Sequence, residues 1–454
     1  MKIYVLGSGK VGYAIAEQLS VEGHDITVVD QNAHVISNIS DALDVETLQG
    51  NVANIETLRN ARVDKADLVI AATSSDEVNI IACLISKKLN AKHTIARVRN
   101  PEYLGALSAL KDELGLSMSI NPEMAAAREI SKMFSYPSQI KMTTFAKGRV
   151  ELAEIKVGDN SPLAGKTVHT INNDFRTNAL LCAIERGDDV IIPSGGTVIY
   201  KGDKISFTGT TKEIKQFLNR IGIKKLRPVR ELMIVGGGKI SFYLIQQLVD
   251  LGMDIKVIEK NYDRCLQLIE RFPSITVIHG DGTNHEFLHS ESIDEMDAFV
   301  ALTDNDEENV VICMYAASQG VVRVIPKVNR VSLGFLLEQL GLDNVITPKN
   351  ITATQIAQYV RAMQNSVGSS IESLIKIVDN KVEILEFRVK HNCKFIGKPL
   401  KDIKLKKGIL VGYISRSGKI EIARGNSTVE LGDSVVIISS IKGLGDINDV
   451  LANS

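Results

Sequence analysis

The stretch KIYVLGSGKVGYAIAEQL (2–19) decides the fold of this chain, because an apolar strand pattern runs directly into a glycine-rich turn and then a helix pattern. Within the helix pattern, Val11, Ile15 and Leu19 are spaced four residues apart and share one face. The next apolar run, DITVVD (25–30), predicts a second strand. The stretch therefore predicts a strand–helix–strand unit with its glycine turn at the carboxyl end of the first strand.

Two further apolar runs extend this pattern, DLVIAAT (67–73) and HTIARV (93–98). Runs this continuous are typical of strands that helices bury on both faces, as in a parallel sheet. The connecting lengths suit right-handed crossovers between parallel strands. The predicted fold class is therefore α/β, with a Rossmann-like parallel sheet.

The opening pattern occurs twice in the chain. ELMIVGGGKISFYLIQQL (231–248) resembles the opening stretch at an offset of 229 residues, and DIKVIE (254–259) resembles DITVVD at the same offset. ADLVIAATSSDEVN (66–79) matches MDAFVALTDNDEEN (296–309) at an offset of 230. The chain therefore consists of two copies, called the first and the second copy, of one unit of about 225 residues.

A smaller module follows the Rossmann-like part of each copy. ELAEIKV (151–157) and its counterpart EILEFRV (383–389) predict half-buried strands. INPEMAAAREI (120–130) resembles ITPKNITATQI (346–356), and Pro122 indicates the start of a helix. The predicted organisation is two tandem Rossmann-like domains at 1–120 and 230–346, connecting helices at 121–139 and 347–367, and small α+β modules at 140–222 and 368–454.

Composition narrows the classes of function. The 454 residues carry 53 basic and 54 acidic side chains and no Trp, so neither a positive field nor an aromatic surface favours nucleic acid. The longest apolar stretch without a charge, 309–322, is shorter than the roughly 20 residues that a membrane-spanning helix needs. The sequence starts without a signal-peptide pattern. Five scattered cysteines without a CxxC pair indicate buried thiols in a reducing cytosol.

The glycine turn of the first copy has the pattern GxGxxG, formed by Gly7, Ser8, Gly9, Lys10, Val11 and Gly12. Gly7 permits the tight turn, Gly9 lets a pyrophosphate approach the backbone, and Gly12 permits close packing of helix and sheet. The phosphates would bind at the helix N-terminus, where free N–H groups favour anions. Because the motif lies between a strand and a helix, it predicts a dinucleotide site.

Asp30 ends the second strand and is the expected partner of the adenosine ribose hydroxyls. Residues 31–33 contain no Arg, so a 2′-phosphate would be repelled and NAD(H) preferred over NADP(H). The alternative is a Rossmann-like fold that has lost its ligand.

The second copy carries a weaker version of this motif, formed by Gly236, Gly237, Gly238, Lys239 and Ile240. Ser241 replaces the third glycine, so we expect the helix to sit slightly further out or to repack. Glu259 replaces Asp30 and is still able to bind a ribose diol. Both a second nucleotide site and a purely structural copy remain open.

Other polar residues follow strands at the same edge of each predicted sheet: Asn51, Thr73, Ser74 and Arg97 in the first copy, and Asp281, Thr303 and Lys327 in the second. They could line adenine, ribose or pyrophosphate. For Ser74, Asp76, Asp304 and Asp306, capping of the next helix is an equally good interpretation. For Arg97 the alternative is a surface ion pair.

His285-Glu286-Phe287-Leu288-His289 forms HExxH, a pattern typical of zinc metallopeptidases. The equivalent first-copy stretch, 55–59, contains no metal ligand apart from Glu56, so we interpret the match as a solvated helix face. No nucleophile–base pair is recognisable, so the sequence predicts neither catalytic residues nor a metal site.

The motifs GSGKVG (7–12), QGN (49–51), ATSSDEVN (72–79) and IARVRNPEY (95–103), with the small module and a second copy of both parts, resemble the TrkA family. Members of this family are regulatory subunits of bacterial Trk potassium-uptake systems. The repeated unit resembles an RCK domain with its C-terminal module. The resemblance covers essentially the whole chain and places the nucleotide residues at the positions named above.

The resemblance implies a non-enzymatic protein on the cytoplasmic face of the inner membrane. Binding of NAD(H), with ATP or ADP as further candidates, would shift a gating ring beneath a TrkH-type membrane subunit and so control K⁺ uptake. The ring would be a homo-oligomer, a tetramer supplying eight RCK units. An NAD-dependent dehydrogenase is the alternative. The preference between NAD+ and NADH, the second site's ligand and the ligand of the small modules stay open.

Overall fold

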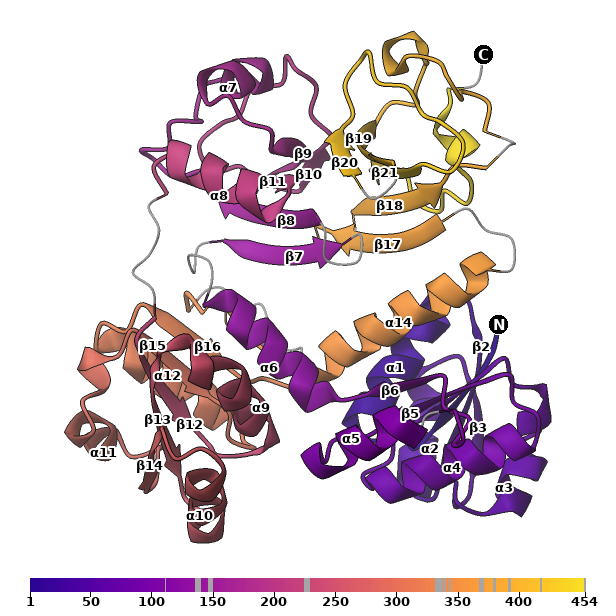
Figure 1. The fold of residues 1–454 in the computed structure, drawn as a ribbon, viewed down its shortest axis with the longest axis vertical. Helices are drawn as coiled ribbons and strands as arrows, with labels where there is room; N and C mark the ends of the chain where they lie inside the picture. The colour runs from indigo at the N-terminus through magenta and orange to yellow at the C-terminus, as the bar shows by residue number, and fades with distance from the viewer. Residues whose placement is uncertain are drawn as a thin grey trace. The chain divides into compact units, whose positions relative to one another are not determined.

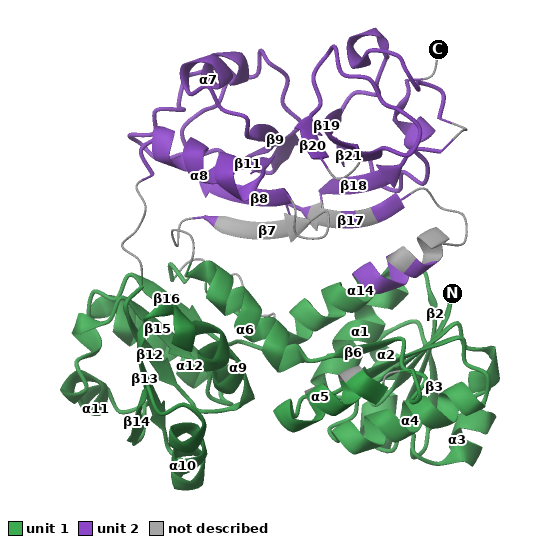
Figure 2. Cartoon of the chain, viewed as in Figure 1, with its two compact units in different colours: residues 1–135, 228–357 green, residues 136–227, 358–454 purple. Residues whose placement is uncertain are grey.

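The computed structural model describes residues 1–110, 112–134, 140–145, 150–223, 229–330, 337, 340–342, 344–366, 371–378, 381–390, 393–416 and 419–452. The chain divides into two compact units. Unit 1 comprises Met1–Ser135 and Pro228–Ala357, and unit 2 comprises Tyr136–Arg227 and Gln358–Ser454 (Figure 2). The units therefore interleave along the sequence: unit 1 holds the Rossmann-like domains of both copies, and unit 2 holds both small modules.

The first Rossmann-like domain is built on a parallel sheet of six strands in the order β3-β2-β1-β4-β5-β6. Its strands are β1 Lys2–Leu6, β2 Asp25–Asp30, β3 Glu46–Gln49, β4 Leu68–Ala71, β5 His93–Arg97 and β6 Met118–Ile120. Its helices are α1 Lys10–Val21, α2 Ala33–Ala42, α3 Ile55–Asn60, α4 Asp76–Lys88 and α5 Pro101–Leu110, with the short 3-10 helix η1 Val63–Lys65 (Figure 1).

The second Rossmann-like domain repeats this arrangement with the strand order β14-β13-β12-β15-β16, again all parallel. Its strands are β12 Glu231–Val235, β13 Asp254–Glu259, β14 Thr276–His279, β15 Ala298–Ala301 and β16 Arg323–Pro326. Its helices are α9 Lys239–Leu248, α10 Tyr262–Arg271, α11 His285–Ser290 and α12 Asp306–Ser318, with the 3-10 helices η2 Val249–Leu251 and η3 Ile293–Glu295. The predicted Rossmann-like parallel sheets are confirmed in both copies.

Burial on both faces explains why the sequences of these strands are continuously apolar. In β4 every residue is buried, and the central residues of β1 and β12 are as well. Because helices cover both faces of each sheet, side chains that point in opposite directions are both removed from water. The apolar period of two that marks a half-exposed strand is therefore absent from these segments.

Two long helices follow the parallel sheets, α6 Pro122–Met133 and α14 Pro348–Ser366. Each begins at a proline, whose missing N–H costs nothing in the first turn. Ala126, Ile130 and Phe134 join the core of the second Rossmann-like domain, where they lie in one cluster with Tyr243 of α9. A helix of the first copy thus completes the core of the second, which is why both domains belong to one unit.

Unit 2 contains two antiparallel sheets, ordered β10-β9-β11-β8-β7 and β17-β18-β21-β19-β20. The first module has β7 Lys141–Phe145, β8 Val150–Lys156, β9 Leu180–Arg186, β10 Asp189–Ile191 and β11 Lys204–Gly209, with α7 Val168–Asp174 and α8 Thr211–Arg220. The second has β17 Ile371–Ile377, β18 Val382–Arg388, β19 Ile409–Arg416, β20 Lys419–Ile422 and β21 Ser434–Ser439, with the 3-10 helices η5 Leu400–Asp402 and η6 Ile447–Val450. Parts of the predicted segments 121–139, 140–222, 347–367 and 368–454 lie outside the described residues.

The two modules of unit 2 share a core. Cys182 of β9, Ile384 of β18 and Tyr413 of β19 belong to one buried cluster. The Tyr413 hydroxyl donates a hydrogen bond of 2.5 Å to the carbonyl oxygen of Thr208 in the other module. This bond satisfies the polar end of an otherwise apolar buried side chain.

Candidate functional site

The two glycine turns have the same backbone conformation. Gly7 has φ +91° and Gly236 has φ +97°, in the left-handed region that disfavours any side chain. A Cβ atom at Gly7 would also lie 2.7 Å from the backbone nitrogen of Thr73, and one at Gly236 would lie 3.0 Å from the carbonyl carbon of Leu302. Each turn therefore presses directly against the loop that follows the neighbouring strand.

The third glycine position of the motif differs between the copies. A Cβ atom at Gly12 would lie 2.0 Å from the carbonyl oxygen of Gly7. In the second copy Ser241 occupies this position, fully buried, and its Oγ donates a hydrogen bond to the carbonyl oxygen of Gly236. Ser241 therefore forms a hydrogen bond to the turn, and the outward shift or repacking of the helix stays a prediction.

Both glycine turns lead into a helix whose N-terminus has no capping side chain. Gly9 and Gly238 are the N-cap residues of α1 and α9, and neither helix has a side-chain cap. By contrast, Asn32 and Asn261 cap the helices that come next. A Cβ atom at Gly9 or Gly238 would meet no atom within 4 Å, so the space in front of both N-termini is open. Free N–H groups facing open space are what a phosphate group needs.

The carboxylates of Asp30 and Glu259 lie beside these turns and hold them in place. Asp30 accepts hydrogen bonds from the backbone N–H groups of Ser8, at 2.7 Å, and Asn32, at 2.9 Å. Glu259 accepts the equivalent bonds from Gly237 and Asn261, both at 2.6 Å. Glu259 is buried, whereas Asp30 is only partly buried and keeps solvent access. Both carboxylates thus have a structural role at the position predicted for ribose binding.

An asparagine that the sequence analysis did not single out organises the next loop. Asn79 is fully buried, and its Oδ1 accepts hydrogen bonds from the N–H and the hydroxyl of Thr73. Its Nδ2 donates to the carbonyl oxygen of Arg97 at 2.9 Å. Asn309 makes the same bonds with Thr303 and Lys327. The signal was present in the sequence, since both matched stretches 66–79 and 296–309 end in Asn.

The capping interpretation of the acidic residues in these loops is wrong. Ser75 caps α4 and Asn305 caps α12. Asp76 and Asp306 lie inside the first turn of these helices. Asp76 Oδ2 accepts from the N–H groups of Arg99 and Asn100, both at 2.8 Å, and Asp306 does the same for Asn329 and Arg330. These buried carboxylates fasten the loop after the next strand, because a carboxylate accepts two backbone N–H bonds well. Ser74 contributes only its carbonyl oxygen, as acceptor from Arg99.

Asn51 and Asp281 hold their own loops. Asn51 Oδ1 accepts from the Ala53 N–H at 2.9 Å. Asp281 accepts from Thr283 and, at 2.9 Å, from Lys260 Nζ. Hydrogen bonds from Lys260 and then Thr283 lower the pKa of Asp281 to about 2, so this carboxylate is ionised throughout the physiological range.

Arg97 and Lys327 each form an ion pair. Arg97 Nη2 lies 3.5 Å from Glu123 Oε1 of α6, and Nη1 donates to the carbonyl oxygen of Thr73 at 3.4 Å. Only 13% of the Arg97 side chain is exposed, and burial lowers its pKa. Lys327 Nζ lies 3.5 Å from Asp304 Oδ1. The ion pair considered for Arg97 therefore exists, but it is mostly buried.

Each glycine-turn lysine lines a cleft with residues of the other copy. Lys10 lines a cleft of about 530 Å³ whose other lining residues all come from the second copy, among them Asn305 and Lys349. Lys239 lines a cleft of about 960 Å³ together with Asn100 and Glu102 of the first copy. The structure thus brings together the turn of one copy and the loops of the other, which the sequence analysis did not predict.

The HExxH segment forms α11, and its first histidine is engaged elsewhere. The ring of His285 stacks on Tyr315 of α12 with 4.2 Å between centroids, and the Tyr315 hydroxyl donates to the His285 carbonyl oxygen. Over the part of the chain that the structure describes, no group of three or more His, Cys, Asp or Glu residues is placed to hold a metal ion.

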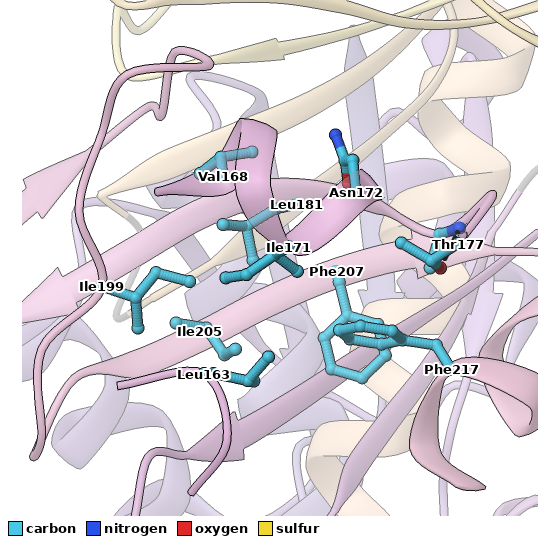
Figure 3. Close-up of a pocket in the computed structure, with 11 residues that line it drawn as sticks. Leu163, Val168, Ile171, Asn172, Thr177, Leu181, Ile199, Ile205, Phe207 and Phe217 are labelled. Atoms are coloured by element: carbon cyan, nitrogen blue, oxygen red, sulfur yellow. Dashed lines mark hydrogen bonds between the residues drawn. The ribbon is translucent and has the colours of Figure 1, made fainter. Parts of the chain in front are cut away.

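Unit 2 contains a small apolar pocket between α7, α8 and the first antiparallel sheet (Figure 3). Its volume is about 10 Å³, which holds roughly one water molecule. Ile171, Phe207 and Phe217 lie on its wall, and Asn172 and Thr177 supply its polar groups. The pocket is a packing gap in the module core and is too small for a nucleotide.

Comparison with known proteins identifies the family. The TrkA-N domain matches residues 3–122 and 232–348, and the TrkA-C domain matches residues 152–222 and 384–452. The chain is 33% identical over 447 residues to "Trk system potassium uptake protein TrkA homolog 2" of Methanosarcina mazei, covering 97% of each. It is 31% identical over 441 residues to "Trk system potassium uptake protein TrkA" of Vibrio alginolyticus, covering 96% of this chain and 95% of the relative.

Solved structures share the fold. The GsuK RCK domain superimposes with a TM-score of 0.63 at 17% identity, covering 96% of this chain and 92% of that chain. The GsuK channel bound to NAD gives 0.62 at 17% identity, covering 96% of this chain and 76% of that one. With matching domains in both copies and relatives aligned along nearly its full length, this chain belongs to the TrkA family of Trk system potassium uptake proteins.

Proposed function

We propose that this chain is the regulatory subunit of a Trk-type potassium uptake system, and that it binds NAD(H) at the first glycine turn. The observation that carries the proposal is the open, uncapped N-terminus of α1 beside the partly exposed carboxylate of Asp30. Free N–H groups suit the pyrophosphate, and the carboxylate suits the ribose diol. ATP and ADP are further candidates, because they carry the same adenosine and phosphate groups.

Nucleotide binding in related folds supports this proposal. Structures of GsuK with a similar fold are described as bound to NAD and bound to ADP. In this chain the nucleotide residues would be those of the two glycine turns with Asp30, Asn51, Thr73, Ser74 and Arg97, and with Glu259, Asp281, Thr303 and Lys327. Asn51, Thr73, Ser74 and Arg97 act mainly by shaping the loops, because their side chains or carbonyl groups bond to protein partners.

The family supports a proposal for the partner and for the assembly. We infer a TrkH-type membrane subunit as the partner, a position on the cytoplasmic face of the inner membrane, and a ring of four chains with eight RCK units. Among the described residues, no helix is both long and apolar enough to cross a bilayer. The channel named in the GsuK structures supports a gating role for this fold.

A dehydrogenase is the competing function. It would need a general acid or base beside the nicotinamide, at the edge formed by the ends of β4 and β5. The ionisable side chains placed there, Asp76, Arg97 and Glu123, are committed to loop bonds and buried ion pairs. This arrangement favours ligand sensing, in which binding shifts a conformational equilibrium.

The test is K⁺ flux through the membrane subunit reconstituted with this chain, measured with NAD+, NADH, ATP and ADP, alongside NADH consumption. We expect the K⁺ flux to differ from one nucleotide to another, and we expect no consumption of NADH. Gly9→Val should leave the chain folded, since its Cβ meets no neighbour, but should weaken the response to nucleotide. Identical flux with all four nucleotides would contradict the gating function, and steady NADH oxidation with a carbonyl substrate would favour the dehydrogenase.

A further inference from the structure

We propose that the second glycine turn binds a dinucleotide whose adenosine ribose carries a 2′-phosphate, such as NADP(H), and that Arg264 of α10 binds this phosphate. The inference rests on the proposed function, because it assigns a ligand class to the second nucleotide site. The first site has no equivalent arginine and would keep NAD(H). The two sites of one chain would then take different dinucleotides.

The carboxylate that ends the second strand of the second copy is enclosed by the protein. Only 7% of the Glu259 side chain is exposed, and its two oxygens accept from the N–H groups of Gly237 and Asn261, both at 2.6 Å. A Cβ atom at Gly237 would lie 3.1 Å from Glu259 Oε2 and 2.8 Å from Leu268 Cδ1, so the turn packs against both side chains. Glu259 therefore offers little surface to a ribose hydroxyl, whereas Asp30 keeps solvent access.

Arg264 lies next to this enclosed carboxylate and is itself open to solvent. Its Nη1 atom lies 4.0 Å from Glu259 Oε2, and 53% of its side chain is exposed. Because this ion pair is long, the guanidinium keeps N–H groups for a further acceptor. In a Rossmann-like site the end of the second strand lies beside the adenosine ribose, and an arginine near it accommodates a 2′-phosphate. The planar guanidinium can donate two parallel hydrogen bonds to such a phosphate.

The first copy lacks these positive charges. At the offset of 229, Arg264 corresponds to Val35, and Lys260 corresponds to Gln31. Lys260 Nζ lies 2.9 Å from Asp281, so its charge has a close partner, and Arg264 is the less tightly paired of the two added cations. The absence of an arginine after the second strand predicts NAD(H) for the first copy. The same reasoning predicts the 2′-phosphorylated form for the second copy.

The face of α10 that carries Arg264 lines the cleft of about 960 Å³ that contains the second glycine turn. Three polar residues of α10 on its wall follow the helical spacing i, i+3 and i+7, and therefore share one face: Arg264, Gln267 and Arg271. Their equivalents in the first copy are shorter or apolar: Val35, Asn38 and Ala42. The second copy thus presents long donor side chains along a cleft whose volume is in the range of cofactor sites.

The charges on the wall of this cleft have a positive excess. The basic lining residues are Lys239, Arg264 and Arg271, and the acidic ones are Glu102 and Glu270. Three positive and two negative charges leave the lining residues with a formal charge of +1. A 2′-phosphate adds up to two negative charges to a dinucleotide, so the cleft favours the phosphorylated ligand over the unphosphorylated one.

The test measures equilibrium binding of NADPH and of NADH to the full chain and its variants. Arg264→Val introduces the residue of the first copy. Arg59→Val is the matched control, because Arg59 of α3 is also a helix arginine paired with a glutamate, and 55% of its side chain is exposed. Gly238→Val blocks the second turn without a clash, since its Cβ would meet no atom within 4 Å. NADH binding with and without Asp30→Ala reports on the first site.

We expect one class of sites to bind NADPH at least about tenfold more tightly than NADH, since a charge-assisted contact contributes that much. Arg264→Val and Gly238→Val should each abolish this class, Arg59→Val should keep it, and NADH binding at the first site should stay unchanged in all three variants. The proposal is overturned by equal affinities for NADPH and NADH in the parent chain, by a preference that survives Arg264→Val or Gly238→Val, or by one that Arg59→Val also removes.

Failure of this proposal is distinguishable from failure of the proposed function. NADH binding that depends on Asp30 would still stand if the NADPH-preferring class were absent, and the first site would then remain the nucleotide sensor. Loss of NADH binding in the parent chain would instead contradict the proposed function itself.

Discussion

Tyr243 and Arg99 are joined across the two copies: the Tyr243 hydroxyl donates a hydrogen bond of 2.7 Å to the Arg99 carbonyl oxygen. The same hydroxyl accepts from Asn121 Nδ2 at 2.9 Å. Arg99 in turn contacts the loop after β4 through Ser74 and Asp76. The helix that begins at the second glycine turn is thereby connected to the loop that follows β4 in the first copy.

Removing this hydroxyl should destabilise unit 1. In Tyr243→Phe, the buried Nδ2 of Asn121 loses its stronger partner, and we expect a loss of about 1–2 kcal/mol in the free energy of unfolding. Urea denaturation of the full chain measures it. Tyr262→Phe is the matched control, because Tyr262 is 60% exposed and its hydroxyl has no partner among the described residues. Equal stability of the two variants would show that the bond across the copies contributes nothing.

Asp30 should govern NADH affinity. Asp30→Ala removes the proposed ribose acceptor and also frees the Ser8 N–H that holds the turn, so NADH binding should weaken by about 1–3 kcal/mol. Calorimetric titration measures this change. Asp30→Asn keeps an acceptor oxygen but loses the charge, and it should fall between the parent and the alanine variant. An unchanged dissociation constant in Asp30→Ala would remove this residue from the site.

Gly12 should tolerate no side chain. In Gly12→Ala the new Cβ would lie 2.0 Å from the Gly7 carbonyl oxygen, a backbone atom that cannot swing away. We expect a loss of about 1–3 kcal/mol in stability. Gly105→Ala in α5 is the control, and it should raise the stability. Its Cβ meets no neighbour, and alanine favours a helix over glycine by about 1 kcal/mol. Thermal unfolding of both variants decides the matter, and a Gly12→Ala protein as stable as the parent would contradict the packing argument.

Asp203 should make the stability of unit 2 depend on pH. Burial alone raises its pKa, but hydrogen bonds from Arg186 and from the Tyr200 N–H outweigh burial and hold the pKa below the ordinary 3.8. A lowered folded pKa gives stability that is complete above the unfolded value and is lost as the pH falls through the folded value. Stability should therefore decline below about pH 4.

Asp203→Asn is the test of that dependence. Unfolding free energies measured between pH 6 and pH 2 should fall less steeply in this variant, because one proton fewer is taken up on unfolding. The variant should also be less stable near neutral pH, because Asn offers one acceptor oxygen, and no charge, to the two Arg186 N–H groups that the carboxylate accepts. Parallel curves for parent and variant would exclude Asp203 as the titrating group.

Local pattern in the sequence determined the elements and their order. The glycine turn, the apolar strands and the repeat at offsets of 229 and 230 follow from contacts between residues close in sequence. Turn conformation and helix period depend on such neighbours, so Gly7, Gly9 and Asp30 were found at the positions where the structure places the open helix N-terminus. Ser75 and Asn305 were missed as caps because four consecutive polar residues offer several equivalent caps, and only backbone geometry chooses among them.

Only the tertiary structure decided which copy each residue serves. Lys10 belongs to the first glycine turn by sequence, yet it lines a cleft of the second copy, and Tyr243 contacts Arg99, 144 residues away. Such contacts come from the burial of α6 in the core of the second Rossmann-like domain, where Ile130 and Phe134 join Tyr243. No local period encodes this burial, because the apolar face of α6 predicts only that something covers it. The identity of the covering surface depends on shape and volume across the whole of unit 1.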